Sequence, residues 1–221
     1  MNPFKFFQDI RIINLEKDKT RMQNVTAEMN KMGVEFTRFN AIERKVGAVG
    51  ATLSHKLCIL EAKENNKKNL LIFEDDVVFM YDKEKTYRLL NEAIEYLKDK
   101  DWDILYLGIN LVDVGDKPNN VVFTISENLY KVRAGYGAFA YAINGKVFDE
   151  YLALIPEEEN ISVINKTIID QILRFELCQR EKMLFVPLVL MEAVNLSTNQ
   201  SGFVDYNKSI LARYKKYGVK Y

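Results

Sequence analysis

Three adjacent acidic residues, Glu74, Asp75 and Asp76, directly follow the short apolar run Leu70–Phe73. Adjacent carboxylates repel one another, so such a cluster is unfavourable unless a cation lies beside it. Hard divalent cations bind carboxylate oxygens and commonly share them with substrate phosphates. If strand geometry continues past Phe73, the side chains of Glu74 and Asp76 point the same way. The cluster indicates a metal-phosphate site; the alternative is that two acids cap the next turn and one faces solvent.

The elements around this cluster predict an α/β fold. Ile10–Leu15 is typical of a buried strand, a helical pattern follows between Asp18 and Gly33, and Val34–Phe39 is a second strand. We expect Asp18 to cap that helix. Strand, helix, strand is the unit of a parallel sheet, and ligands bind beyond the carboxyl ends of its strands. Carboxylates that follow Leu70–Phe73 would therefore lie at the binding edge of the sheet.

The rest of the chain continues this pattern without an internal repeat or a linker, so we expect one domain over residues 1–221. Thr52 and Ser54 are expected to open a helix, and Asp82 another. The stretch Asn110–Asn120 is expected to be a loop. Further strands are expected at Ile104–Leu107, Phe139–Ile143 and Leu184–Val186, a hairpin at Val121–Ile125 and Leu129–Val132, and helices at Lys146–Leu154, Ile168–Cys178 and Asn207–Tyr217.

Composition narrows the classes of function. Lys and Arg number 31 and Asp and Glu number 31, so the net charge is zero, which argues against a nucleic-acid-binding protein. His55 is the only histidine, which excludes mechanisms that need two. No signal-peptide pattern and no apolar stretch of transmembrane length is present, so we expect a cytoplasmic protein. The basic segment Asn207–Tyr217 could touch an anionic membrane from the periphery, or it is simply a solvated helix face.

Several segments also form an ordered set of motifs. In chain order they are IINLEKDKTR with Asn14, Leu15 and Arg21, GAVGATLSHKLCIL with His55, LLIFEDDVVF, DILYLG, GYGAFAYAINGKVFDEYL, IIDQIL with Asp170, and QSGFVD. Together they resemble glycosyltransferase family 25, the lipooligosaccharide β-galactosyltransferase family related to collagen galactosyltransferases. The resemblance covers about Ile10 to Asp205, although Val204 stands where the family typically has Ser.

This resemblance implies a GT-A-like nucleotide-sugar-binding fold, with a mixed, mostly parallel sheet flanked by helices. It implies a metal-dependent hexosyltransferase that uses Mn²⁺, or Mg²⁺, and a UDP-sugar donor, usually UDP-galactose. The sugar would pass with inversion to a glycan or glycolipid acceptor. The identity of the acceptor does not carry over, because the chain is short on the acceptor side.

The resemblance also implies roles for the acidic cluster and the first strand. Asp76 would bind the metal on the diphosphate, and Glu74 would contact the ribose or hold the metal through water. Asp75 could serve either purpose. Asn14 and Leu15 would line the donor site at the end of the first strand. Arg21 would bind a phosphate or stack on the base; the alternative is an ordinary solvated charge.

Three further residues each have a functional and a structural interpretation. His55 would donate a hydrogen bond in the donor site, or it is structural. Asp170 would be the general base that an inverting transfer needs, with Asp205 and Asp76 as alternatives; otherwise it is a helix cap or a surface carboxylate. Tyr136, between Gly135 and Gly137, would stack on a sugar, or the glycines simply make a turn.

Two other classes of function remain open on the sequence. The acidic cluster would equally serve another metal-phosphate enzyme, such as a nucleotidyltransferase, although the chain has no P-loop pattern. A non-catalytic glycan-binding protein could retain the same fold.

Overall fold

A computed structural model describes residues 1–113, 121–174, 182–191 and 206–221. Its elements are η1 (Pro3–Phe6), β1 (Ile10–Asn14), α1 (Lys19–Met32), β2 (Thr37–Asn40), α2 (Gly47–Glu64), β3 (Asn69–Glu74), β4 (Val77–Phe79), α3 (Lys83–Lys98), β5 (Ile104–Tyr106), β6 (Asn110–Leu111), β7 (Val122–Thr124), β8 (Tyr130–Val132), β9 (Gly135–Tyr136), β10 (Ala140–Asn144), η3 (Gly145–Val147), α4 (Phe148–Leu154), η4 (Glu158–Asn160), α5 (Ile169–Ile172), β11 (Met183–Phe185), β12 (Val189–Met191) and α6 (Tyr206–Lys216).

Within the described residues, the main sheet has eight strands in the order β2-β1-β3-β10-β5-β11-β8-β7. β1 runs parallel to β2 and β3, and β11 runs parallel to β5. β10 runs antiparallel to β3 and β5, and β8 runs antiparallel to β11 and β7. Only β10 and β8 therefore oppose the common direction. The expected mixed, mostly parallel sheet flanked by helices is confirmed.

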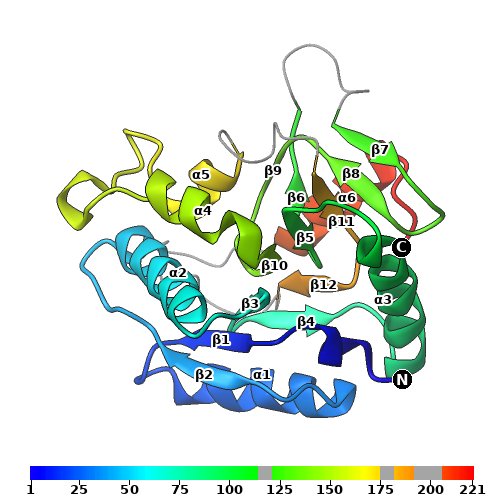
Figure 1. Cartoon of the computed structure of the whole chain (residues 1–221), viewed down its shortest axis with the longest axis horizontal. Coiled ribbons are helices and arrows are strands. Elements are labelled where there is room, and N and C mark those ends of the chain that lie inside the picture. Colours follow the sequence, from blue (N-terminus) through cyan, green and yellow to red (C-terminus); the bar gives the residue numbers. More distant parts are fainter. Residues whose placement is uncertain (114–120, 175–181, 192–205) are drawn as a thin grey trace.

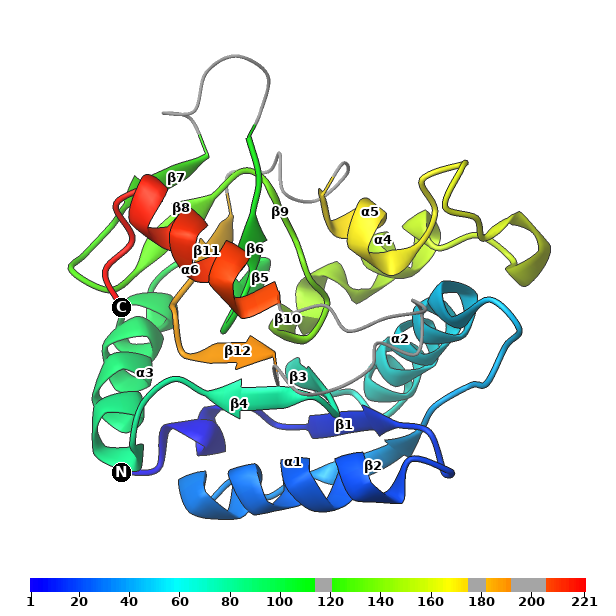
Figure 2. The ribbon, with the colours of Figure 1, turned by 180° about the vertical axis from the view of Figure 1, so that it is seen from behind.

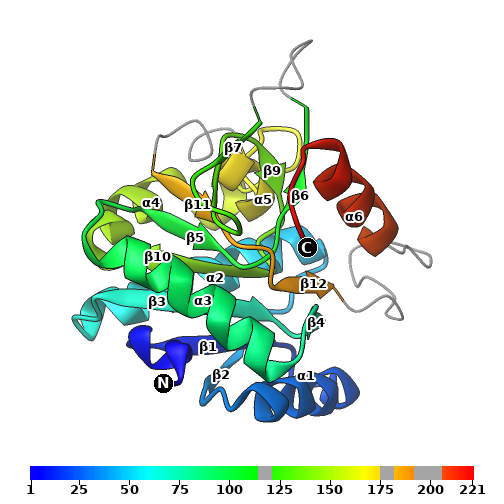
Figure 3. The same cartoon turned by 90° about the vertical axis from the view of Figure 1, so that its right-hand side faces the viewer.

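The central strands are apolar because both faces of the sheet are covered. All five residues of β1 are buried, as are the first five of β3. Figure 3 shows α3 in front of the sheet and α2 and α4 behind it. Strands covered on both faces read as continuous apolar runs rather than alternating ones. This is why Leu70–Phe73, and Ile10–Ile13 with its one polar residue Arg11, could be recognised as strands from the sequence.

The start of α2 differs from the expectation. The helix begins at Gly47, so Thr52 and Ser54 lie inside it instead of opening it. Both hydroxyls bond back to carbonyls four residues earlier, from Thr52 Oγ1 to Ala48 O at 2.7 Å and from Ser54 Oγ to Gly50 O at 2.7 Å. Such bonds satisfy a hydroxyl in a helix interior, so neither residue needs a capping position.

Other helix and strand boundaries also differ from the expected ones. The second strand is β2, which begins three residues later than expected, and the first part of the expected loop at Asn110 pairs with β9 as β6. The expected hairpin is confirmed as β7 and β8. The helix expected over Ile168–Cys178 begins as α5, and its part beyond residue 174 lies outside the described residues.

The C-terminal helix α6 supports the small β6–β9 pair. Ile109 N–H donates to Tyr214 Oη at 3.2 Å, and Arg213 Nη1 donates to Leu111 O at 2.6 Å. Figures 1 and 2 show α6 beside β6. The last helix therefore holds in place a pair of strands that lies next to the site described below.

Candidate functional site

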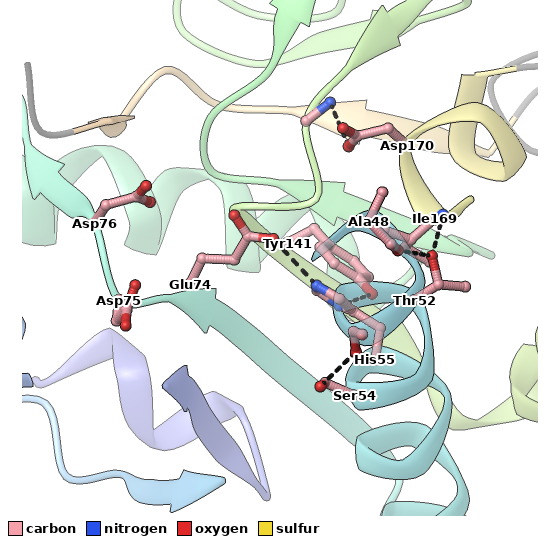
Figure 4. Close-up of polar contacts among 12 residues, drawn as sticks. Ala48, Thr52, Ser54, His55, Glu74, Asp75, Asp76, Tyr141, Ile169 and Asp170 are labelled. Carbon is pink, nitrogen blue, oxygen red and sulfur yellow. Dashed lines mark hydrogen bonds and ion pairs between the residues drawn. The ribbon is translucent and has the colours of Figure 1, made fainter. Parts of the chain in front are cut away.

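The acidic cluster lies at the carboxyl end of β3, as predicted. Glu74 is the last residue of β3, and Asp75 and Asp76 form the turn into β4. β1 lies parallel beside β3, with Ile13 opposite Glu74, so Asn14 at the end of β1 reaches the same edge. Figure 4 shows the three acidic side chains spread along this turn, with Glu74 directed toward His55.

Asp75 is held by two of the residues expected in the donor site. Asn14 Nδ2 donates to Asp75 Oδ2 at 2.6 Å. Arg21, on α1, forms an ion pair with Asp75 Oδ1 at 2.9 Å and with Asp76 Oδ2 at 2.5 Å. Its side chain is only 16% exposed, so Arg21 is not an ordinary solvated charge. The structure brings Asn14, Arg21 and the acidic cluster together.

The neighbours of this group complete the edge of the sheet. Arg38, on β2, donates from Nε to Asn14 Oδ1 at 3.0 Å and so orients the Asn14 amide toward Asp75. Leu15 contributes its carbonyl, which accepts from Asp18 N–H at 2.9 Å and closes the turn into α1. Arg38 was not singled out from the sequence, because an arginine in an exposed edge strand carries no recognisable pattern.

Three buried polar atoms around Arg21 have no hydrogen-bond partner among the described residues. They are Asp18 Oδ2, Arg21 Nε and Asp76 Oδ1. Asp18 stands at the N-cap position of α1, but its side chain does not cap the helix, contrary to expectation. Its orphaned oxygen lies in the same small region as the orphaned Arg21 nitrogen. Unpaired buried groups are unfavourable by about 1–3 kcal/mol each, so three together suit a region that a polar ligand completes.

Burial raises the pKa of every acid in the cluster. The pKa of Glu74 is raised to about 7, first by desolvation and then by the charge of Asp75. The pKa values of Asp75 and Asp76 are raised to about 6, again mainly by desolvation, against the lowering effect of Arg21. Arg21 thus neutralises only part of the negative charge. A site that disfavours its own ionised carboxylates is one that a cation would stabilise.

The residues present fit an open metal site rather than a closed one. Within the described part of the chain, no three His, Cys, Asp or Glu side chains are arranged to hold a metal between them. One carboxylate oxygen, Asp76 Oδ1, lacks a partner, and Glu74 is 30% exposed beside it. Mg²⁺ and related ions are often held by one or two carboxylates, with substrate phosphates and water as the other ligands. Asp76 and Glu74 match that arrangement.

His55 is fully buried and takes part in a chain of hydrogen bonds. Its Nδ1 lies 3.0 Å from Tyr141 Oη, and its Nε2 lies 3.4 Å from Glu74 Oε1. Tyr151 Oη donates to Tyr141 Oη at 3.3 Å, which leaves the Tyr141 hydrogen for His55 Nδ1. With this order of donors, the imidazole proton is assigned to Nε2, the nitrogen that faces Glu74. Burial lowers the pKa of His55 to about 4, so the ring is neutral at pH 7.

Tyr141 and Tyr151 are functional neighbours that the sequence did not reveal. Tyr141 comes from β10 and Tyr151 from α4. Neither residue lies in a short motif with His55, which is 86 residues before Tyr141. The residues meet only because β10 inserts next to β3 while α4 packs on α2.

Asp170 lies on the opposite side of the site from the acidic turn, with its carboxylate facing Glu74 (Figure 4). Its Oδ1 accepts from Gly137 N–H at 3.2 Å. Burial and the charge of Glu74 raise the pKa of Asp170 to about 6. Gly137 has φ of 123°, a conformation that favours glycine and that turns its N–H toward Asp170. Asp170 is therefore neither a helix cap nor a surface carboxylate.

Helix α5 is fixed to α2 next to this contact. Ile169 N–H donates to Thr52 Oγ1 at 2.9 Å, so a buried hydroxyl of α2 anchors the residue before Asp170. Asp205, the alternative base, lies outside the described residues, as does the Val204 segment. Among the described residues, every side chain expected in the catalytic and metal sites thus borders one region at the end of β3.

No protein-family model and no curated protein matches this sequence. The chain is similar in structure to a glycosyltransferase involved in the glycosylation of the major capsid of PBCV-1, with 10% identity over 94% of this chain and 99% of that one, at a TM-score of 0.48. It is also similar to a UDP-glucose pyrophosphorylase complexed with UDP-glucose, with 13% identity over 94% and 81% of the two chains, at a TM-score of 0.45. At this level of similarity, membership of family 25 stays a prediction.

A search of the described residues finds no helix that is long and apolar enough to cross a membrane.

Proposed function

We propose that residues 1–221 form one catalytic domain, a metal-dependent, inverting hexosyltransferase that transfers galactose from UDP-galactose to a hydroxyl of a glycan or glycolipid. One observation carries the proposal. At the carboxyl end of β3, Asp76 has a buried oxygen without a partner, Arg21 lies beside it, and a second carboxylate, Asp170, faces Glu74 across the site. Metal, diphosphate and base would then meet in one place, as a sugar transfer requires.

Asp76 and Glu74 would hold the Mn²⁺ or Mg²⁺ ion together with the two phosphates of the donor. The bound ion supplies Lewis-acid stabilisation of the charge that develops on the leaving diphosphate. Arg21 would exchange its contact with Asp76 for a phosphate oxygen, with its unpartnered Nε as a second donor. Asn14 would keep Asp75 in place, so that Asp75 remains paired with Arg21 during this exchange.

Asp170 would act as the general base. Its pKa of about 6 leaves it ionised at pH 7 yet close enough to neutrality to accept a proton. In the transfer, the acceptor oxygen forms a bond to the anomeric carbon on the face opposite to UDP. Its proton passes to Asp170, and the bond from the anomeric carbon to the phosphate oxygen breaks, with its electron pair leaving on UDP. The attack on the opposite face inverts the anomeric carbon.

His55 would position Glu74 rather than exchange protons. A histidine with a pKa of about 4 stays neutral through the reaction, and its Nε2–H is directed at the Glu74 carboxylate. A hydrogen bond from this fixed, buried donor would keep Glu74 in the orientation needed to bind a metal ion or the ribose. Tyr141 contributes indirectly, because it sets the tautomer of the ring.

The test is thermal unfolding of the purified protein against UDP, UDP-sugars and other nucleotides, with and without Mn²⁺. A ligand that binds only the folded state raises the melting temperature by mass action. We expect UDP-galactose to raise it only with metal, and Asp76→Ala to abolish the increase. Asp99→Ala is the matched control, since Asp99 is an exposed aspartate at the end of α3.

The outcomes separate the classes of function. Metal-dependent binding followed by release of UDP from UDP-galactose supports the transferase. Release of pyrophosphate from a nucleoside triphosphate and a sugar phosphate would replace it with a nucleotidyltransferase. Full nucleotide binding by Asp76→Ala would remove the metal role of Asp76, and no nucleotide binding by the wild type would overturn the proposal.

A further inference from the structure

A second polar cluster lies on the far side of Asp170, where α5 meets the β6–β9 pair. Its members are Asn110, Tyr136, Gln171 and Arg174, each of which is half-buried. Asn110 and Tyr136 are directly opposite one another in the antiparallel pair, so their side chains leave the same face. Gln171 and Arg174 are three residues apart in a helical turn and share a face as well.

Two contacts join the two halves of this cluster. The Arg174 guanidinium lies over the Tyr136 ring, 4.3 Å from its centroid, and also donates to the Tyr136 hydroxyl. Gly137, next to Tyr136, donates its N–H to Asp170, which immediately precedes Gln171. Because Asn110 shares a face with Tyr136 and Gln171 shares a face with Arg174, the contact between Tyr136 and Arg174 brings the two amide side chains to the same junction.

Both amide oxygens in this cluster are buried and lack a hydrogen-bond partner among the described residues. They are Asn110 Oδ1 and Gln171 Oε1, and the three other such atoms of the described residues surround Arg21. An amide oxygen without a donor is unfavourable, because it loses the hydrogen bonds to water that it makes in the unfolded chain. Two such acceptors at one contact, unpaired among the described residues, are groups that a bound ligand can satisfy.

The charges nearby restrict what those donors can be. A metal ion could also bind amide oxygens, but the Arg174 cation beside Tyr136 disfavours a second positive charge. Phosphate groups carry no hydrogens to donate to an amide oxygen when they are ionised. Neutral hydroxyl groups fit, because each donates one hydrogen bond without bringing charge into a half-buried site.

We infer that Asn110 and Gln171 bind hydroxyl groups of a pyranose, with Tyr136, held by Arg174, forming one wall of its site. The inference rests on the proposed function and names residues that select the sugar. The pyranose belongs either to the UDP-hexose donor or to the acceptor. In both cases it lies near Asp170, because Gly137, next to Tyr136, donates its N–H to the Asp170 carboxylate.

The test compares ligands that do and do not carry a sugar. Calorimetric titration measures the affinity of wild type, Asn110→Leu and Gln171→Met for UDP and for UDP-galactose, UDP-glucose and UDP-N-acetylglucosamine, all with Mg²⁺. Both substitutions remove the amide oxygen and roughly keep the volume. Asn91→Leu, an exposed position on α3, is the matched control. Asn110→Ala replaces Asn110→Leu if the latter lowers the melting temperature.

For a donor sugar, we expect the wild type to bind one UDP-hexose more tightly than UDP. Each variant should then bind that UDP-hexose about fivefold more weakly, the usual effect of one hydrogen bond, with UDP affinity unchanged. For an acceptor sugar, UDP-hexose affinity stays constant. Saturation-transfer NMR signals of methyl galactoside or methyl glucoside, recorded with UDP and Mg²⁺, should then fall in the variants.

Unchanged affinities and unchanged NMR signals in both variants would overturn the inference while leaving the transferase intact. A wild type that binds no UDP but binds methyl glycosides, with loss in the variants, would overturn the proposed function and retain the pyranose site. A wild type that binds neither UDP nor methyl glycosides would overturn both.

Discussion

In the absence of metal, the ionised Asp76 side chain should lower the free energy of unfolding, and Asp76→Asn should therefore raise it. Desolvation and the neighbouring Glu74 raise the pKa of Asp76 from 3.8 to about 6. One pKa unit corresponds to about 1.4 kcal/mol, so at pH 7 the ionised side chain destabilises the fold by roughly 3 kcal/mol. The Arg21 ion pair is already included in that pKa, so it does not reverse the sign.

The amide of Asp76→Asn removes the charge and keeps the shape. It also puts an NH2 group in place of Asp76 Oδ1, an atom that has no hydrogen-bond partner among the described residues. An unpaired buried donor is unfavourable by about 1–3 kcal/mol. We therefore expect a net gain of up to about 2 kcal/mol in the free energy of unfolding at pH 7, whereas a typical surface substitution changes it by no more than about 0.5 kcal/mol.

The pH dependence of the stability difference between variant and wild type shows whether the ionised carboxylate is its cause. A carboxyl group whose pKa is higher in the folded than in the unfolded protein binds more protons when folded, so stability is lost as pH rises between the two values. For Asp76 that window runs from 3.8 to about 6. The advantage of Asp76→Asn should be greatest above pH 6, decline below it and turn into a loss of about 1–3 kcal/mol near pH 4, where only the unpaired amide remains.

The assay is urea unfolding in EDTA at several pH values, followed by the fluorescence of Trp102. This residue is the only tryptophan and is 4% exposed, so its emission reports loss of the core. Asp99→Asn, at an exposed position, should show no such pH-dependent gain. An Asp76→Asn variant that is less stable than the wild type, and by the same amount at every pH, would refute the reasoning. The ion pair with Arg21 would then outweigh desolvation.

Three further predictions concern other parts of the site and its support. Tyr141→Phe removes the hydrogen that His55 Nδ1 accepts, so the melting temperature should fall by the equivalent of about 1–2 kcal/mol, and turnover should fall while UDP affinity is kept. In Gly108→Ala the new Cβ would lie 2.3 Å from Val189 O, so urea unfolding should show a loss of about 2–3 kcal/mol; an unchanged midpoint would mean that the backbone there is not held. Asp170→Asn should lower kcat by about 10²–10⁴ without weakening UDP binding, and a normal kcat would exclude Asp170 as the base.

Much of the donor half of the site could be predicted from the sequence. The strands β1 and β3 are mostly apolar and end in Asn14 and Glu74, so their ends were recognisable from residue type. Parallel neighbours end at the same edge, so Asn14, which the family resemblance placed in the donor site, lies at the same edge as Glu74. The same local reasoning failed for Thr52 and Ser54, which looked like the start of a helix but lie inside α2.

The other half of the site depends on contacts between distant segments. Tyr141 reaches His55 because β10 runs antiparallel between β3 and β5, a reversal that no local pattern encodes. Gly137 reaches Asp170 across 33 residues of chain. Hydrogen bonds of this kind follow from the order of strands and the packing of short helices.

By itself, the sequence determined the α/β class, the two buried strands with polar ends, and the acidic cluster at the binding edge. These features follow from the period of apolar residues and from the repulsion among neighbouring charges, which are local properties. Only the tertiary structure decided the neutral state of His55, the place of Asp170 and the two unpartnered amides of Asn110 and Gln171. Burial and hydrogen-bond partners set those properties, and both are supplied by residues far away in the chain.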